Sequence, residues 1–133
     1  MPGSFSDKAL ALWAAWQDQD DILIAPTLLA FEVTSSLRRL VHLGGITPSE
    51  GEEAFQRFLQ MDIRLSNQRG IIPLAWELAR QLDRPRAYDT SYLALAQLRG
   101  CEFWTADERL YNAIRHKLTW VRWLGDFNPR QAD

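Results

Sequence analysis

Hydrophobic side chains recur at helical spacing along several stretches of the chain. In the first stretch, Ala9, Leu12, Trp13 and Trp16 follow the i, i+3, i+4, i+7 pattern of one helix face. The same spacing, read together with proline and glycine at the ends of the stretches, predicts helices over 4–17, 27–45, 47–61, 71–83, 87–100 and 107–118.

Short apolar runs lie between these helices and predict strands over 21–26, 101–106 and 119–127, with a weaker candidate over 62–67. Helices that alternate with short apolar strands favour parallel pairing in a sheet covered by helices. The sequence therefore predicts an α/β fold, and its 133 residues predict one domain over 1–133. Ligands of such sheets bind beyond the carboxyl ends of the strands, and Asp107 directly follows the strand predicted over 101–106.

Helix ends carry recognisable signals. Ser4 with Asp7 fits a capping pair for the first helix, Thr27 is expected to cap the second, and Thr47 the third. Gly44–Gly45 and Gly100 are expected to end the helices that precede them.

Charge and composition narrow the function classes. Hydrophobic residues make up 47% of the chain, which is typical of a folded protein. The net charge is −2, so the overall charge of the protein does not attract nucleic acid. Contact with nucleic acid would need a local basic patch or a bound cation.

The sequence holds no apolar run of about 18 residues, the length that a membrane span needs, and no secretory signal, so we expect a cytoplasmic protein. Cys101, the single cysteine, is predicted to be a buried core thiol.

Asp89 and Asp107 each stand where a predicted helix begins. Helix capping explains Asp107, and either capping or the helix dipole suits Asp89. A cation is the alternative partner, because a carboxylate among packed side chains needs one. Glu32 lies too far inside its helix to cap it, and it is either a surface glutamate or a third ligand; Asp126 is a weaker candidate.

Carboxylates that converge on one sheet edge suit hard divalent ions, and both Mg²⁺ and Mn²⁺ accept oxygen ligands. Such ions activate water and stabilise the charge that develops on a phosphate. The sequence contains no GxSxG, HExxH or GxxxxGK[ST] motif, which leaves hydrolase triads, zincins and P-loop enzymes unsupported.

Two segments, "APTLLAFEVTSSLRR" and "YDTSYLALAQLRGCEFWTADERL", resemble the PIN-domain ribonucleases, above all the VapC-type toxins of toxin–antitoxin pairs. The resemblance runs from about Ser6 to Phe127, and Glu32, Asp89 and Asp107 match acidic positions of the family. It implies a parallel sheet flanked by helices, a Mg²⁺-dependent site that cuts RNA, a homodimer and a cognate antitoxin protein.

The chain departs from the family pattern at its start. The family begins with a central strand that ends in an aspartate, whereas "MPGSFSDKALALW" enters directly at the first helix. Either the sequence is a truncated product or late-called start, or the natural chain lacks the strand. Because unpaired buried backbone groups are costly, we expect the strands over 21–26 and 101–106 to pair directly or to accept a foreign segment.

Arginines near the three acids provide candidate RNA-binding residues: Arg38, Arg39, Arg86 and Arg109. Scattered solvated charge is the alternative. Three tryptophans fall on helical stripes and are expected in the core or an interface: Trp13, Trp16 and Trp76.

The resemblance therefore predicts a metal-dependent endoribonuclease, the toxin component of a type II toxin–antitoxin system, with Glu32, Asp89 and Asp107 as catalytic metal ligands. The alternative is a catalytically silent PIN-like protein that acts by binding a partner.

Overall fold

The computed structural model describes residues 2–128, with side chains described from Lys8 onward. Its helices are α1 (Pro2–Asp18), α2 (Leu28–His42), α3 (Pro48–Gln60), α4 (Ile71–Gln81), α5 (Tyr88–Arg99) and α6 (Glu108–Ile114). Its strands are β1 (Leu23–Pro26), β2 (Ile63–Ser66), β3 (Phe103–Thr105) and β4 (Val121–Trp123), and a 3₁₀ turn, η1 (Leu124–Asp126), follows β4. The predicted α/β class is confirmed, and each predicted helix is present.

The described residues form two compact units. The small unit is Leu23–Asn67 and holds β1, α2, α3 and β2. The large unit comprises the described residues up to Ile22 and from Gln68 onward, and it holds the remaining elements. The expectation of a single domain stays a prediction.

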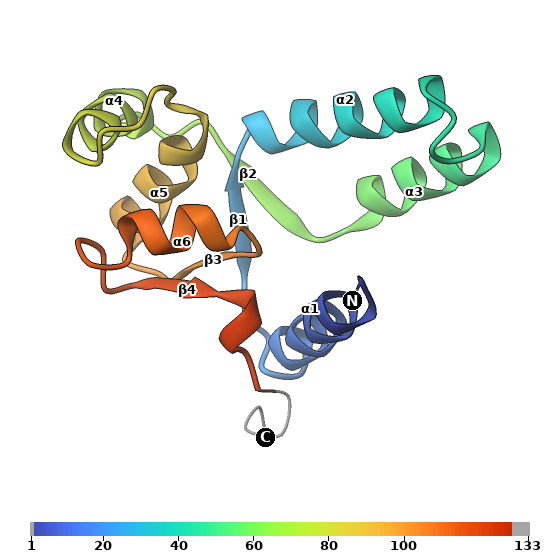
Figure 1. Ribbon diagram of the computed structural model, residues 1–133, viewed down its shortest axis with the longest axis horizontal. Helices are drawn as coiled ribbons and strands as arrows, with labels where there is room; N and C mark the ends of the chain where they lie inside the picture. Colours follow the sequence, from blue (N-terminus) through green and yellow to red (C-terminus); the bar gives the residue numbers. More distant parts are fainter. Residues whose placement is uncertain (1, 129–133) are drawn as a thin grey trace. The chain divides into compact units, whose positions relative to one another are not determined.

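In the small unit, β1 and β2 pair in parallel from Leu23 opposite Ile63 to Pro26 opposite Ser66. The weak strand candidate over 62–67 is thereby confirmed. Helices α2 and α3 lie side by side as an antiparallel pair (Figure 1).

Two predicted helix caps have different outcomes. At α3, the Glu50 backbone N–H donates to Thr47 Oγ1 at 3.0 Å, and the Thr47 backbone N–H donates to Glu50 Oε1 at 2.9 Å. This reciprocal capping box confirms Thr47, and the hydrogen bond from the Thr47 backbone lowers the pKa of Glu50. The prediction for Thr27 was wrong, because Thr27 has helical angles (φ −53°, ψ −27°) and its side chain makes no capping hydrogen bond. The Ser4–Asp7 pair lies outside the described side chains.

Gly51 brings α3 close to α2. It is buried inside α3, and a Cβ atom built on it would lie 2.3 Å from Val41 Cγ2 on α2. Because valine is stiff at χ1, this methyl group cannot easily move away. The two helices therefore require glycine at this position.

In the large unit, α5 packs against α4 and is the most buried helix of the described chain (Figure 1). Its side chains Leu93, Ala94 and Leu95 are at most 1% exposed. On α4, the residues Ile71, Ala75 and Leu78 are buried. Gly100, in the left-handed region at φ +64°, ends α5 as predicted.

The strands β3 and β4 pair in parallel, with Phe103 opposite Val121 and Thr105 opposite Trp123. Helix α6 connects them and contacts both. Aromatic contacts join α1 to this sheet, since Trp16 meets Trp104 edge to face with 6.3 Å between ring centroids, and Trp104 meets Phe127 in the same way at 5.9 Å.

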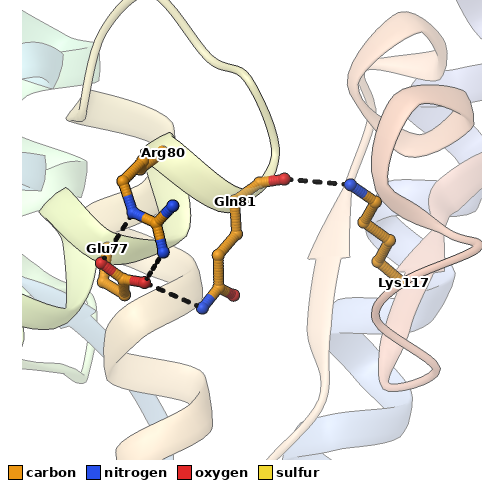
Figure 2. Close-up of polar contacts among 4 residues, drawn as sticks. All are labelled: Glu77, Arg80, Gln81 and Lys117. Carbon is orange, nitrogen blue, oxygen red and sulfur yellow. Dashed lines mark hydrogen bonds and ion pairs between the residues drawn. The ribbon is translucent and has the colours of Figure 1, made fainter.

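The carboxyl end of α4 is held by polar contacts (Figure 2). Lys117, which follows α6, donates from Nζ to the Gln81 carbonyl oxygen at 2.9 Å. A cation at this end suits the helix dipole. The Glu77 carboxylate accepts from the Arg80 guanidinium and from the Gln81 side chain at 3.1 Å, and these bonds lower the pKa of Glu77.

Several expectations about strands and burial are corrected. Direct pairing of the strands over 21–26 and 101–106 was wrong: the hydrogen-bonded neighbour of β1 is β2 and that of β3 is β4. β1 and β3 each pair with the strand that follows them along the chain. Their acceptance of a foreign segment stays a prediction. The strand over 119–127 shortens to Val121–Trp123, because the chain turns at η1, where the Trp123 ring lies over Gly125.

The burial of Cys101 differs from expectation. Cys101 is exposed, since it lies on the connection that precedes β3, although partial burial of its thiol raises the pKa of Cys101. Trp76 is 73% exposed, which excludes the core alternative, because α4 turns Ala75 and Leu78 toward the interior instead. The interface alternative for Trp76 stays a prediction. Among the described residues no helix is both long and apolar enough to cross a membrane.

We expect Gly51→Ala to lower the free energy of unfolding by about 1–3 kcal/mol, because the added methyl group overlaps Val41. Helix propensity alone would give the opposite sign, by about 1 kcal/mol. Chemical denaturation followed by circular dichroism measures the change. The double variant with Val41→Ala, which removes the overlapping atom, is the control and should recover part of the loss. A single Gly51→Ala variant that is more stable than the wild type would contradict the account.

Candidate functional site

Asp107 is the N-cap of α6. Its Oδ1 accepts a hydrogen bond from the Leu110 backbone N–H at 3.1 Å, and its own N–H donates to Thr105 Oγ1 at 3.0 Å. The capping interpretation is therefore confirmed. The residue is exposed, and within the described residues its Oδ2 accepts no hydrogen bond. One oxygen thus fixes the carboxylate, and the other remains available to a ligand.

Asp89 lies in the first turn of α5 but does not cap it. The N-cap position is Ala87, and no side chain makes a capping hydrogen bond there. Asp89 is exposed, and its carboxylate has no hydrogen bond or ion pair with any described residue. The capping interpretation of Asp89 was wrong, whereas a carboxylate in the first turn still suits the helix dipole.

Asp89 and Asp107 lie at the same end of the α5–β3 pair. The short connection 100–102 turns the chain back, so β3 runs along α5 in the opposite direction. The rings of Tyr92 on α5 and Phe103 on β3 contact each other, with their centroids 6.5 Å apart, so these two residues lie side by side. Asp89 precedes Tyr92 by about one turn of α5, and Asp107 lies just beyond the carboxyl end of β3. Both steps lead toward the same end of the pair.

Asp126 joins this edge from the neighbouring strand. It is the last residue of η1, directly after β4, and it is exposed. Because Thr105 pairs with Trp123 in the parallel ladder, the carboxyl ends of both strands reach the same edge of the sheet. The structure therefore places the weaker candidate on the same edge as Asp107.

Glu32 belongs to the small unit, where it lies inside α2, as expected from the sequence, and is exposed. Asp89 and Asp107 belong to the large unit. The roles predicted for these three residues stay predictions.

The donor chemistry of these residues fits a hard divalent ion, since exposed carboxylate oxygens are the ligands that Mg²⁺ prefers. Asp89 adds an observation of its own, because its carboxylate lacks a partner within the described chain. Across the described residues, however, His, Cys, Asp and Glu side chains form no group of three or more placed to hold a metal ion. The roles of Asp89 and Asp107 as metal ligands therefore stay predictions.

The predicted RNA-binding arginines are all exposed and make no ion pair within the part of the chain that the structure describes: Arg38, Arg39, Arg86 and Arg109. Arg86 precedes α5 and Arg109 lies in the first turn of α6, so each is close in sequence to one aspartate. Arg38 instead lines a groove of about 340 Å³ between α2 and α3, together with Thr34 and Glu52.

Two threonines in this region were not singled out from the sequence. Thr105 holds the Asp107 backbone, and a threonine two residues before an aspartate is a local signal that could have revealed it. Thr90 is fully buried and donates from Oγ1 to the Ala75 carbonyl oxygen at 2.8 Å. Its contact is 15 residues away, so no local pattern indicates it.

Comparison with known proteins identifies the family of the chain. The family model described as "PIN domain" matches residues 9–119. Two curated relatives are the VapC ribonuclease Mb0985 of Mycobacterium bovis and ribonuclease VapC9 of Mycobacterium tuberculosis. Each is 34% identical over 88 residues, which cover 66% of this chain and 67% of the relative. No solved structure gives a significant match. The α/β fold, the aspartates at the starts of α5 and α6, and the match over most of the chain show that it belongs to the PIN-domain family.

Proposed function

We propose that this chain is a metal-dependent endoribonuclease that hydrolyses RNA phosphodiesters. The observation that carries the proposal is the position of Asp89 and Asp107 at one end of the α5–β3 pair, within the segment that matches the PIN-domain model. The similar proteins bear the name ribonuclease, which supports RNA as the substrate class.

The proposed ligands of Mg²⁺, or of Mn²⁺ in its place, are Glu32, Asp89 and Asp107. When bound, such an ion promotes ionisation of an attacking water and stabilises the charge that develops on the phosphate. Asp107 is held by its capping hydrogen bond, which orients its second oxygen. Asp89 lies in the first turn of α5, where a carboxylate suits the helix dipole, and it has no protein partner within the described residues.

The exposed arginines supply the phosphate contacts in this proposal. Arg86 and Arg109 would hold RNA phosphates beside the two aspartates, and Arg38 and Arg39 on α2 are the other two proposed phosphate-binding residues. Positive charge is needed here, since the chain as a whole carries −2 and repels a polyanion.

The resemblance to VapC proteins extends the proposal to the biological setting. We infer the toxin component of a type II toxin–antitoxin system, acting in the cytoplasm as a homodimer and restrained by a cognate antitoxin protein. The name VapC, which the similar proteins bear, supports the toxin role and the antitoxin partner.

We expect Asp89→Asn to lower the rate of RNA cleavage at least about 100-fold, because an amide cannot replace the charged oxygen ligand. EDTA should abolish cleavage by the wild type, and excess Mg²⁺ should restore it. A fluorescent RNA cleavage assay measures both effects. Asp62→Asn, which changes an exposed aspartate between α3 and β2 in the same chemical way, is the matched control and should leave the rate unchanged. Cleavage that survives both EDTA and Asp89→Asn would show that the mechanism is wrong.

Asp107 allows its two roles to be separated. Asparagine caps helices as well as aspartate does, so Asp107→Asn should keep the thermal stability of the wild type yet lose metal-dependent cleavage. Asp107→Ala should lose cleavage and also about 1 kcal/mol of stability. Thermal unfolding and the cleavage assay, run on both variants, make the comparison. If Asp107→Asn cleaves RNA as fast as the wild type, the residue is a helix cap and not a ligand.

A further inference from the structure

Thr90 is a buried polar side chain for which the proposed mechanism has no role. It is 0% exposed, and its hydroxyl donates to the Ala75 carbonyl oxygen on α4 at 2.8 Å. It directly follows Asp89 in the first turn of α5. A buried hydroxyl needs a partner, and this one finds it on the neighbouring helix rather than on its own.

The Ala75 carbonyl does not depend on this bond. It lies inside α4, where a carbonyl oxygen accepts from the backbone N–H four residues later. The Thr90 hydroxyl therefore adds a bond to an acceptor that the helix already uses. This bond mainly affects geometry, because it holds the first turn of α5 next to one turn of α4.

The neighbouring hydroxyl provides a contrast. Ser91 donates from Oγ to the Tyr88 carbonyl oxygen at 2.5 Å, inside its own helix, and it is partly exposed. Two adjacent hydroxyls in the same turn thus behave differently: Ser91 bonds locally, and Thr90 joins two helices.

Helix α4 is a fixed reference for both aspartate-bearing helices. The Thr90 hydroxyl joins the start of α5 to the middle of α4. Lys117, beyond the end of α6, donates to Gln81, the last residue of α4 (Figure 2). Successive residues of a helix are rotated by a constant angle, so fixing Thr90 against α4 also fixes the direction of Asp89. Metal ligands need placement within about 0.5 Å.

We propose that Thr90 is a positioning residue whose hydrogen bond to Ala75 sets the rotation of the first turn of α5 and so aims the Asp89 carboxylate at the ligand shared with Asp107. This inference rests on the proposed function, since it gives Asp89 a metal to bind. Thr90 itself does not touch the ion or the RNA.

The test compares Mn²⁺ binding by Thr90→Val, Thr90→Ser and Ser91→Ala, measured by isothermal titration calorimetry beside thermal unfolding. Valine keeps the shape of threonine and removes the hydroxyl, so we expect Mn²⁺ to bind about 10-fold more weakly while the melting temperature changes little. Serine restores the hydroxyl and should recover the affinity. Ser91→Ala removes a local hydroxyl and should bind Mn²⁺ like the wild type.

The outcomes distinguish this inference from the proposed function. If the wild type binds no Mn²⁺, both are overturned. If the wild type binds Mn²⁺ and folded Thr90→Val binds it equally well, only the role of Thr90 is overturned. Should Thr90→Val fail to fold, Thr90→Ser and Thr90→Cys replace it: stronger binding by the serine variant supports the hydrogen bond, and equal binding by the two overturns it.

Discussion

The packing of α5 against α4 is the constraint on which the geometry of the large unit depends. Leu93, Ala94 and Leu95 are almost completely buried, and because consecutive helix residues point in different directions, α5 is covered on more than one side. A helix packed in this way has little freedom to rotate or slide. Because only a short connection follows Gly100, the position of α5 also limits where β3 begins. The capped start of α6 follows β3 directly. Asp89 and Asp107 are therefore placed by the same packing, although 18 positions separate them along the chain.

The two aspartates show how structural and chemical roles overlap at a helix start. Capping uses one carboxylate oxygen of Asp107 and holds the side chain in a defined direction, which a ligand role would also require. Asp89 occupies the analogous first turn without a capping bond, so its charge is balanced by the helix dipole alone within the described chain. A cap and a ligand are thus compatible at Asp107, while Asp89 has a negative charge that still lacks a specific partner.

Much of this fold was accessible from the sequence, because helix periodicity and capping signals are local. The pattern of Ala9, Leu12 and Trp16 predicted α1, and Thr47 with Pro48 predicted the start of α3. The predictions that were wrong depend on contacts between residues that are far apart in the sequence. Cys101 looked apolar in its run but lies on a connection, and the pairing of β1 with β2 depends on partners far along the chain. At the candidate site, the three acids were visible as motifs, whereas Thr90 acts through a contact that only packing reveals.

The central claim is that Asp89 and Asp107 bind one divalent ion together. Paramagnetic Mn²⁺ broadens nuclear resonances in its close surroundings, so titration of an isotope-labelled sample, followed by NMR, reports directly on which residues the ion approaches. The claim predicts that the backbone amide signals of Asp89 and Asp107 disappear at the same low Mn²⁺ concentration, while that of Asp62 persists. Loss of only one of the two signals, or loss of neither before Asp62, would contradict it.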